Sequence, residues 1–97
     1  MEEITHYGKL SLDNTTVEFR AEYEDYYITG EAECDIILER EEEPELGIQN
    51  SYYLDGISYW YLKVKDTANN EIHLNDKELN SCKNDIENYF SKLTKEL

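Results

Sequence analysis

Two neighbouring stretches of alternating apolar and polar residues constrain the fold of this chain most strongly. The first covers residues 15–23 and the second covers residues 27–39, with Ile37 as the one apolar residue out of phase. Successive side chains of a strand point to opposite faces, so each stretch predicts a strand with one buried face and one polar face. Glu24-Asp25 lies between them as a corner, and together they predict a hairpin.

The two faces of this predicted hairpin differ in charge. The predicted buried face comprises Val17, Phe19, Ala21, Tyr23, Ile28, Gly30, Ala32, Cys34, Ile36 and Leu38. The predicted outer face comprises Thr16, Glu18, Arg20, Glu22, Tyr27, Thr29, Glu31, Glu33, Asp35 and Glu39. An even-length turn between the strands sets the two apolar rows side by side. The sequence therefore predicts a sheet with an acidic outer face.

Turn-forming residues divide the rest of the first 74 positions into further predicted strands. A short strand is expected over residues 10–12, before the turn formers Asp13-Asn14, and another over residues 71–74. Residues 40–50 are expected to form an exposed loop, because Pro44 cannot donate a ladder hydrogen bond and the consecutive glutamates repel one another.

The Asp55-Gly56 pair predicts a type I′ hairpin turn between strands over residues 51–54 and 57–65. In the second of these strands the alternation predicts a core face and an outward face. The predicted core face comprises Trp60, Leu62 and Val64, and the predicted outward face comprises Tyr59, Tyr61, Lys63 and Lys65.

The period changes near the C-terminus, where a helix is predicted over about residues 76–96. Asn75 followed by Glu78 resembles a capping box, in which the Asn75 side chain accepts an early helix amide. Apolar side chains then recur at spacings of three and four, namely Leu79, Cys82, Ile86, Tyr89, Phe90, Leu93 and Leu97. Strands followed by one amphipathic helix predict an α+β fold, an antiparallel β-meander with the C-terminal helix packed on one face.

Length and composition fit a single domain over residues 1–97. Nine Tyr, two Phe and one Trp favour a packed fold despite a net charge of −14. The first residues are acidic where a secretory signal is basic, and no apolar run reaches the roughly 18 residues of a membrane span. With only two cysteines, too few for a disulfide framework, the expected protein is soluble, reduced and cytoplasmic.

The negative charge is concentrated in the first part of the chain. Residues 1–56 carry 16 acidic and three basic residues, whereas residues 57–97 carry seven acidic residues and six lysines. The stretch "EAECDIILEREEEPE", residues 31–45, holds eight acidic residues and one base, Arg40. A solvated face usually mixes charges of both signs, so this concentration is the feature that most needs a functional explanation.

Motifs for catalysis and for cofactor binding are absent from the sequence. The four glycines lie far apart and form no phosphate-binding loop, and residues 41–45 lack the glycine and the ligand spacing of a calcium-binding EF-hand. Cys34 and Cys82 fall on apolar faces, where a thiol is a small core residue and not a nucleophile. We therefore expect a protein that is not an enzyme and that has no cofactor and no dedicated metal site.

The predicted acidic face suits a partner that itself binds nucleic acid. Outward carboxylates on one strand lie about 6.6 Å apart, a regular row of negative charge that is comparable to a phosphate backbone. A basic groove would attract such a row, and tyrosines would supply apolar anchoring. The expected partner-binding residues are Glu22, Glu24, Asp25, Tyr27, Glu31, Glu33, Asp35, Glu39, Glu41, Glu42, Glu43 and Glu45. No direct contact with nucleic acid or a membrane is expected.

In size, composition and layout, the chain resembles the small acidic inhibitors encoded by phages and mobile elements. The fragments "EYEDYYITGEAECD", on the strand pair, and "LNDKELNSCKNDIENYF", on the helix, represent that layout. Such inhibitors include anti-CRISPR and anti-restriction proteins that imitate nucleic acid, and uracil-glycosylase inhibitors. The resemblance implies an inhibitor that blocks the nucleic-acid-binding groove of a nuclease or CRISPR effector in the host cytoplasm, with an anti-CRISPR protein as the leading expectation.

Two alternatives from other functional classes remain open at the level of sequence. An immunity protein that neutralises a basic nuclease toxin would use similar electrostatics with a different partner. An acidic phage structural or housekeeping protein would need its charge only for solubility. The sequence leaves the oligomeric state undetermined as well.

Overall fold

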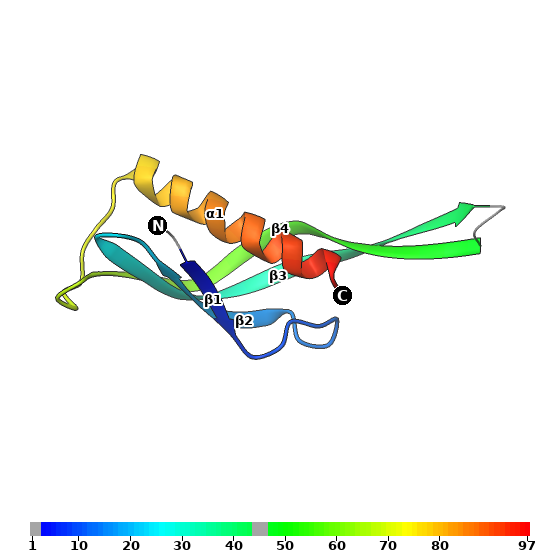
Figure 1. Cartoon of the computed structure of the whole chain (residues 1–97), viewed down its shortest axis with the longest axis horizontal. Helices are drawn as coiled ribbons and strands as arrows, with labels where there is room; N and C mark the ends of the chain where they lie inside the picture. Colours follow the sequence, from blue (N-terminus) through cyan, green and yellow to red (C-terminus); the bar gives the residue numbers. More distant parts are fainter. Residues whose placement is uncertain (1–2, 44–46) are drawn as a thin grey trace.

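The computed structural model describes the backbone of residues 3–43 and 47–97 and the side chains of residues 3–39 and 51–97. One sheet and one helix make up this part of the chain (Figure 1). The strands are β1 (Glu3–Tyr7), β2 (Thr16–Glu22), β3 (Tyr26–Glu43) and β4 (Gly47–Asp66), and the helix is α1 (Asp76–Lys95). The sheet is antiparallel with the order β1-β2-β3-β4. The predicted α+β meander with one C-terminal helix is confirmed.

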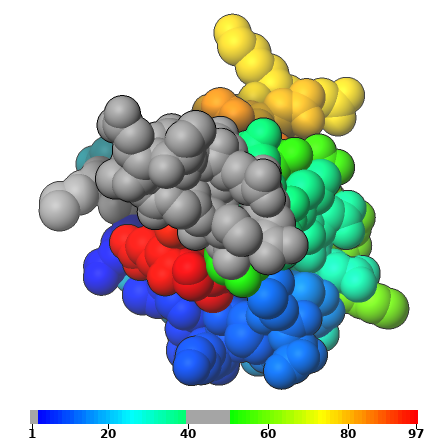
Figure 2. Space-filling view, turned by 90° about the vertical axis from the view of Figure 1, so that its right-hand side faces the viewer, coloured from blue at the N-terminus to red at the C-terminus, as the bar shows by residue number. Residues whose placement is uncertain are grey.

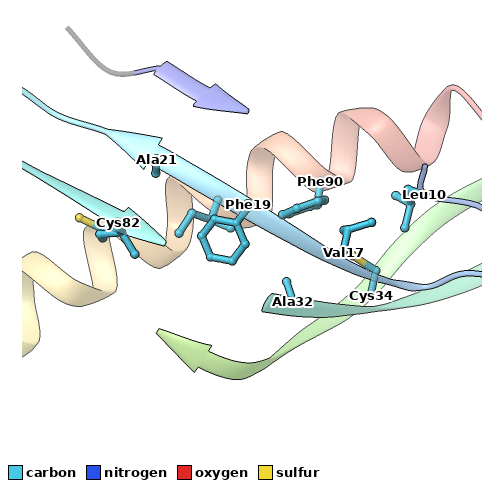
Figure 3. Close-up of a cluster of buried hydrophobic side chains, with 10 residues drawn as sticks. Leu10, Val17, Phe19, Ala21, Ala32, Cys34, Cys82 and Phe90 are labelled. Carbon is cyan, nitrogen blue, oxygen red and sulfur yellow. The ribbon is translucent and has the colours of Figure 1, made fainter. Parts of the chain in front are cut away.

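The core lies between α1 and one face of the sheet (Figure 3). Its buried members are Leu10, Val17, Phe19, Ala21, Ile28, Ala32, Cys34, Cys82, Ile86 and Phe90. The ring of Phe19 from β2 meets the ring of Phe90 from α1 edge to face, with centroids 5.9 Å apart. The buried face that the alternation predicts for β2 and for the first part of β3 is therefore confirmed.

Gly30 lies in β3 at a point where the backbone and side chains of both neighbouring strands come close. A Cβ atom there would lie 2.6 Å from the Tyr61 carbonyl oxygen and 2.9 Å from Cζ of Phe19. Neither a backbone atom nor a core ring can move aside easily. Glycine is therefore needed at this position for close packing.

The helix begins and packs as its sequence predicts. The Asn75 side-chain oxygen accepts a hydrogen bond from the backbone N–H of Glu78 at 2.8 Å. Most of the predicted apolar stripe packs in or against the core, namely Cys82, Ile86, Tyr89, Phe90 and Leu93. Leu79 is half-buried outside the core cluster, and Leu97 lies beyond the helix and is 40% exposed. Thr94 is also fully buried, and its hydroxyl donates to the Phe90 carbonyl at 2.8 Å, so this polar side chain is satisfied within the helix.

The β3–β4 hairpin is much longer than the sequence predicts. The expected loop over residues 40–50 is wrong, since β3 continues to Glu43 and β4 begins at Gly47, with these two residues paired. The expected turn at Asp55-Gly56 is also wrong, since β4 runs through it and neither residue has a positive φ. Continuous pairing with the 18-residue β3 replaces the local turn preference. The hairpin extends past the end of α1, and the molecule is 57 Å long (Figure 1).

Two short predicted strands are also wrong. The first strand is β1, because Gly8 turns the chain with a φ of 85° and residues 11–14 form a hydrogen-bonded turn. Leu10 is nevertheless buried, and the segment around it lies beside the C-terminal end of the chain (Figure 2). The expected strand over residues 71–74 is reduced to one bridge, between Lys65 and Glu71.

Trp60 is not in the core, contrary to the sequence prediction, because it lies at a β-bulge. Glu31 pairs with Tyr61 and the next residue, Ala32, pairs with Tyr59, so Trp60 is an extra residue without a partner. The extra residue shifts the alternation, so Tyr59 joins the core and Trp60 is 67% exposed. Leu62 and Val64, beyond the bulge, pack against the core as predicted.

Candidate protein-binding face

The sheet has one face covered by α1 and one face that no described element covers (Figure 1). We call the side chains on the uncovered side the open face. They alternate with the core residues in β2 and β3 and extend through pairing to β1 and β4. The open face comprises Glu3, Thr5, Tyr7, Thr16, Glu18, Arg20, Glu22, Tyr27, Thr29, Glu31, Glu33, Asp35, Tyr61, Lys63 and Lys65.

One row of the open face crosses all four strands. The register pairs Tyr7 with Glu18 and Glu18 with Glu31. Glu31 in turn pairs with Tyr61. We call Tyr7, Glu18, Glu31 and Tyr61 the central row. It spans about 14 Å, three strand spacings, and places two carboxylates between two aromatic rings.

The carboxylates of the open face gather along β3. Glu33 and Asp35 follow Glu31 on the same side of the strand, with about 6.6 Å between successive positions. Glu18 lies directly opposite Glu31 on β2. Like charges directly opposite each other destabilise a sheet, so this arrangement opposes folding and does not assist it.

The other end of the open face is mixed in charge, which the sequence prediction did not include. Lys65 pairs with Tyr27 and Lys63 pairs with Thr29, so the register brings two lysines to the same end of the open face as Arg20, on the far side of β3. Arg20 donates from Nε to Glu22 Oε1 at 2.8 Å. The mixed end, which also holds Glu3 and Glu22, is therefore less strongly acidic than the central row and the part of β3 that follows it.

Tyr27 is already engaged within the fold at this mixed end. The Arg20 guanidinium carbon lies 4.2 Å from the centre of its ring, and its hydroxyl donates to Asn69 Oδ1 at 2.6 Å. Tyr27 therefore has one ring face and its polar tip in use, which makes it a weaker candidate anchor than a free aromatic ring.

The predicted partner-binding residues whose side chains the structure describes divide into four groups. Glu31, Glu33 and Asp35 lie together on the open face. Glu22 and Tyr27 lie at the mixed end, and Glu24 and Asp25 are exposed at the turn between β2 and β3. Glu39 is exposed on the extended hairpin, opposite Ser51. The side chains of Glu41, Glu42, Glu43 and Glu45 lie outside the described residues.

Exposed aromatic side chains, two on the open face and one next to it in the chain, are the main feature that the sequence interpretation missed. Tyr7 is 55% exposed, Trp60 is 67% exposed and Tyr61 is 40% exposed. Tyr7 was not expected to lie in a strand, and Trp60 was expected in the core. The sequence indicates exposed aromatic residues only through their large number. That number does not show which face of the sheet they occupy.

A second cluster of polar side chains joins the sheet to α1. The rings of Tyr23 and Tyr26 stack with centroids 5.1 Å apart, and the Tyr23 hydroxyl donates to Asp85 at 3.1 Å. The Tyr26 hydroxyl lies 3.3 Å from Sγ of Cys82. Burial raises the pKa of Tyr23 above its ordinary value, and the contact with Cys82 raises the pKa of Tyr26. Both phenols stay protonated at neutral pH and act as fixed links between the layers.

The Cys34 thiol is expected to make stability pH-dependent under alkaline conditions. Burial, together with the charges of Asp35 and Glu33, raises its pKa from 9.0 to about 11. Between pH 9 and 11 the folded state therefore keeps a proton that the unfolded state loses. The contribution of Cys34 to stability is fully present below pH 9 and is lost as the pH rises to 11. The shift corresponds to a loss of about 3 kcal/mol. Urea unfolding at half-unit pH steps measures this loss.

The Cys34→Ala variant provides the control for this dependence. Its unfolding free energy should fall less than that of the unsubstituted protein as the pH rises from 9 to 11. Tyr23, Tyr26 and Tyr59, whose pKa values are also raised in the folded state, add the same decline to both proteins. An equal decline in both proteins between pH 9 and 11 would contradict the assignment to Cys34.

Comparison with protein-family models, with curated proteins and with solved structures finds no match to this chain. Within the part of the chain that the structure describes, no group of three or more His, Cys, Asp and Glu side chains converges to hold a metal ion. None of the described helical residues forms a span long and apolar enough to cross a membrane.

Proposed function

We propose that the chain is a protein-binding inhibitor whose open face imitates nucleic-acid charge and blocks the nucleic-acid-binding groove of a basic target. The acidic inhibitors that it resembles favour a CRISPR effector as the target and the cytoplasm as the site of action. The mechanism is steric and electrostatic: the inhibitor occupies the groove and performs no chemistry.

The spacing of carboxylates on the uncovered face of the sheet is the observation that carries this proposal. Glu31, Glu33 and Asp35 repeat at about 6.6 Å along β3. Every second phosphate of one B-DNA strand is separated by about 6.8 Å along the axis. A groove whose lysines and arginines are placed for phosphates can therefore meet carboxylates at a matching interval.

The opposition of Glu18 and Glu31 supports a functional role for this charge. Two like charges directly opposite each other cost roughly 0.2–1 kcal/mol relative to a neutral pair. Solubility needs only charge somewhere on the surface, and it gains nothing from this placement. A positively charged partner would relieve the repulsion, so the arrangement favours the bound state.

A pull-down at two salt concentrations tests the proposal. The tagged protein is incubated with bacterial lysate at about 0.1 M and 1 M salt, where screening lengths are about 10 Å and 3 Å. We expect one or a few basic nucleic-acid-binding proteins at low salt, identified by mass spectrometry, and their loss at high salt. Added DNA or RNA should displace them, because both ligands would use the same groove.

The recovered protein is then purified and assayed for nucleic-acid binding or cleavage with increasing inhibitor. Inhibition that is reversed by excess nucleic acid is the expected result. Recovery of structural virion proteins alone, or of a partner that nucleic acid does not displace, would contradict the proposal and leave the acidic face with a solubilising role.

A further inference from the structure

The mixed end of the open face shows how this fold holds a guanidinium group. Arg20 bonds to the Glu22 carboxylate at 2.8 Å and lies over the Tyr27 ring at 4.2 Å. A guanidinium is planar, so it can stack on an aromatic ring while its N–H groups bond to a carboxylate. One carboxylate and one aromatic ring, on neighbouring strands, are enough to form this arrangement.

The central row contains the same pair of groups twice without a guanidinium. Tyr7 pairs with Glu18, and Tyr61 pairs with Glu31, each across one strand spacing. Arg20–Glu22 is the one ion pair among the described side chains, so neither central carboxylate has such a partner there. The Lys63 ammonium lies 5.9 Å from the centre of the Tyr61 ring, but an ammonium is not a planar group.

We infer that the central row, with Trp60 beside it, is a docking surface for arginine side chains of the partner protein. This inference rests on the proposed function and specifies the chemistry of the partner. One guanidinium would lie between Tyr7 and Glu18, and a second between Glu31 and Tyr61, the residue that follows Trp60 in the chain. The negative charge of the face and the positive charge of an arginine-rich segment are complementary.

The arrangement distinguishes arginine from lysine. Carboxylates attract both side chains, whereas aromatic rings favour the flat and weakly hydrated guanidinium over the compact ammonium. The carboxylates should therefore determine the strength and the salt dependence of binding. The aromatic side chains should determine the preference for arginine.

Two labelled peptides of equal length and charge test the inference, one alternating arginine with serine and one alternating lysine with serine. Fluorescence anisotropy at about 0.1 M salt gives both affinities for the purified protein. We expect the arginine peptide to bind about five-fold more tightly or better. It should also change the emission of Trp60, the single tryptophan of the chain, which is 67% exposed.

Variants locate the source of this preference. Tyr61→Ala and Tyr7→Ala, alone and together, should bring the two affinities to within about two-fold of each other. Tyr53→Ala is the matched control: Tyr53 is 36% exposed, pairs with Ile37 on the extended hairpin outside the central row, and should leave the preference unchanged. Thermal unfolding of each variant shows whether the fold is retained, and Tyr61→Ala is sufficient for the test if the double variant unfolds.

Equal affinities for the two peptides would overturn the inference, as would a preference that survives both aromatic substitutions. These outcomes are separate from a failure of the proposed function, because the peptide assay uses the purified protein and needs no cellular partner. A nucleic-acid-binding partner in the pull-down without an arginine preference would contradict the docking surface alone. An arginine preference without such a partner would contradict the nucleic-acid mimic alone.

Discussion

Simultaneous substitution of lysine for Glu31, Glu33 and Asp35 is expected to weaken partner binding by about 100-fold or more while leaving the protein folded. Each position changes from attracting a basic groove to repelling it. Close charge pairs at protein interfaces contribute about 1.5 kcal/mol or more each, so three reversals exceed the 2.7 kcal/mol that corresponds to 100-fold. The measurement is the affinity for the pulled-down partner at about 0.1 M salt.

A second triple variant with the same net charge is the control. Lysine in place of Asp13, Glu87 and Glu96 changes three exposed acids that lie in the β1–β2 connection or on and after α1. Both variants change the net charge from −14 to −8, because each substitution adds two positive units. Only the first should lose binding. An equal loss in both would show that total charge, and not the open face, attracts the partner.

The stability of the first variant separates function from folding. Lysine at position 31 faces Glu18 across the strand pair and replaces a repulsive pair with an attractive one. We therefore expect a midpoint of thermal unfolding equal to or above that of the unsubstituted protein. A variant that is at least as stable and yet does not bind would identify these carboxylates as residues that cost stability and serve recognition.

The strands and their buried faces could be predicted from the sequence where burial and period-two alternation act together. β2 and the first part of β3 have a core on one side and solvent on the other, so a shift of one residue would expose Phe19 and Ile28. The helix was predictable for a similar reason, since its apolar stripe and the Asn75 cap mark both its face and its start.

β4 could not be predicted because its departures from alternation depend on its partner. A bulge at Trp60 reverses the phase of the strand, and a second irregularity lies opposite the step from Asp35 to Ile36. The pair Asp55-Gly56 has the local signature of a turn, yet β3 offers an unbroken edge to pair with. Local sequence contains no information about how long that edge continues.

The candidate site was predictable only along a single strand. Glu31, Glu33 and Asp35 share one side of β3, so alternation alone places them together. The central row needs the register of four strands, which brings Tyr7 and Tyr61 into line with residues distant in sequence. The presence of two lysines at the same end of the open face as Arg20 was missed for the same reason.

The largest effect on stability is expected from Phe90→Ala. The Phe90 side chain is fully buried. The centre of its ring lies 5.9 Å from that of Phe19 and 6.5 Å from that of His6. Removing such a ring costs about 3–5 kcal/mol, because the lost transfer energy is joined by the energy of the remaining cavity. A domain of 97 residues has a total stability of about 5–15 kcal/mol, so the variant should be partly unfolded at 37 °C.

Trp60→Ala is the matched control, since it removes a larger aromatic side chain that is 67% exposed. Its unfolding free energy should change by less than about 1 kcal/mol, because surface substitutions away from packed groups have small effects. Urea unfolding followed by far-ultraviolet circular dichroism measures both variants. A larger loss for Trp60→Ala would contradict the packing of α1 against the face of the sheet that holds Phe19. The face available to a partner would then have to be reassigned. A larger loss for Phe90→Ala would show that packing between α1 and the sheet stabilises the fold. The open face would then be free for recognition.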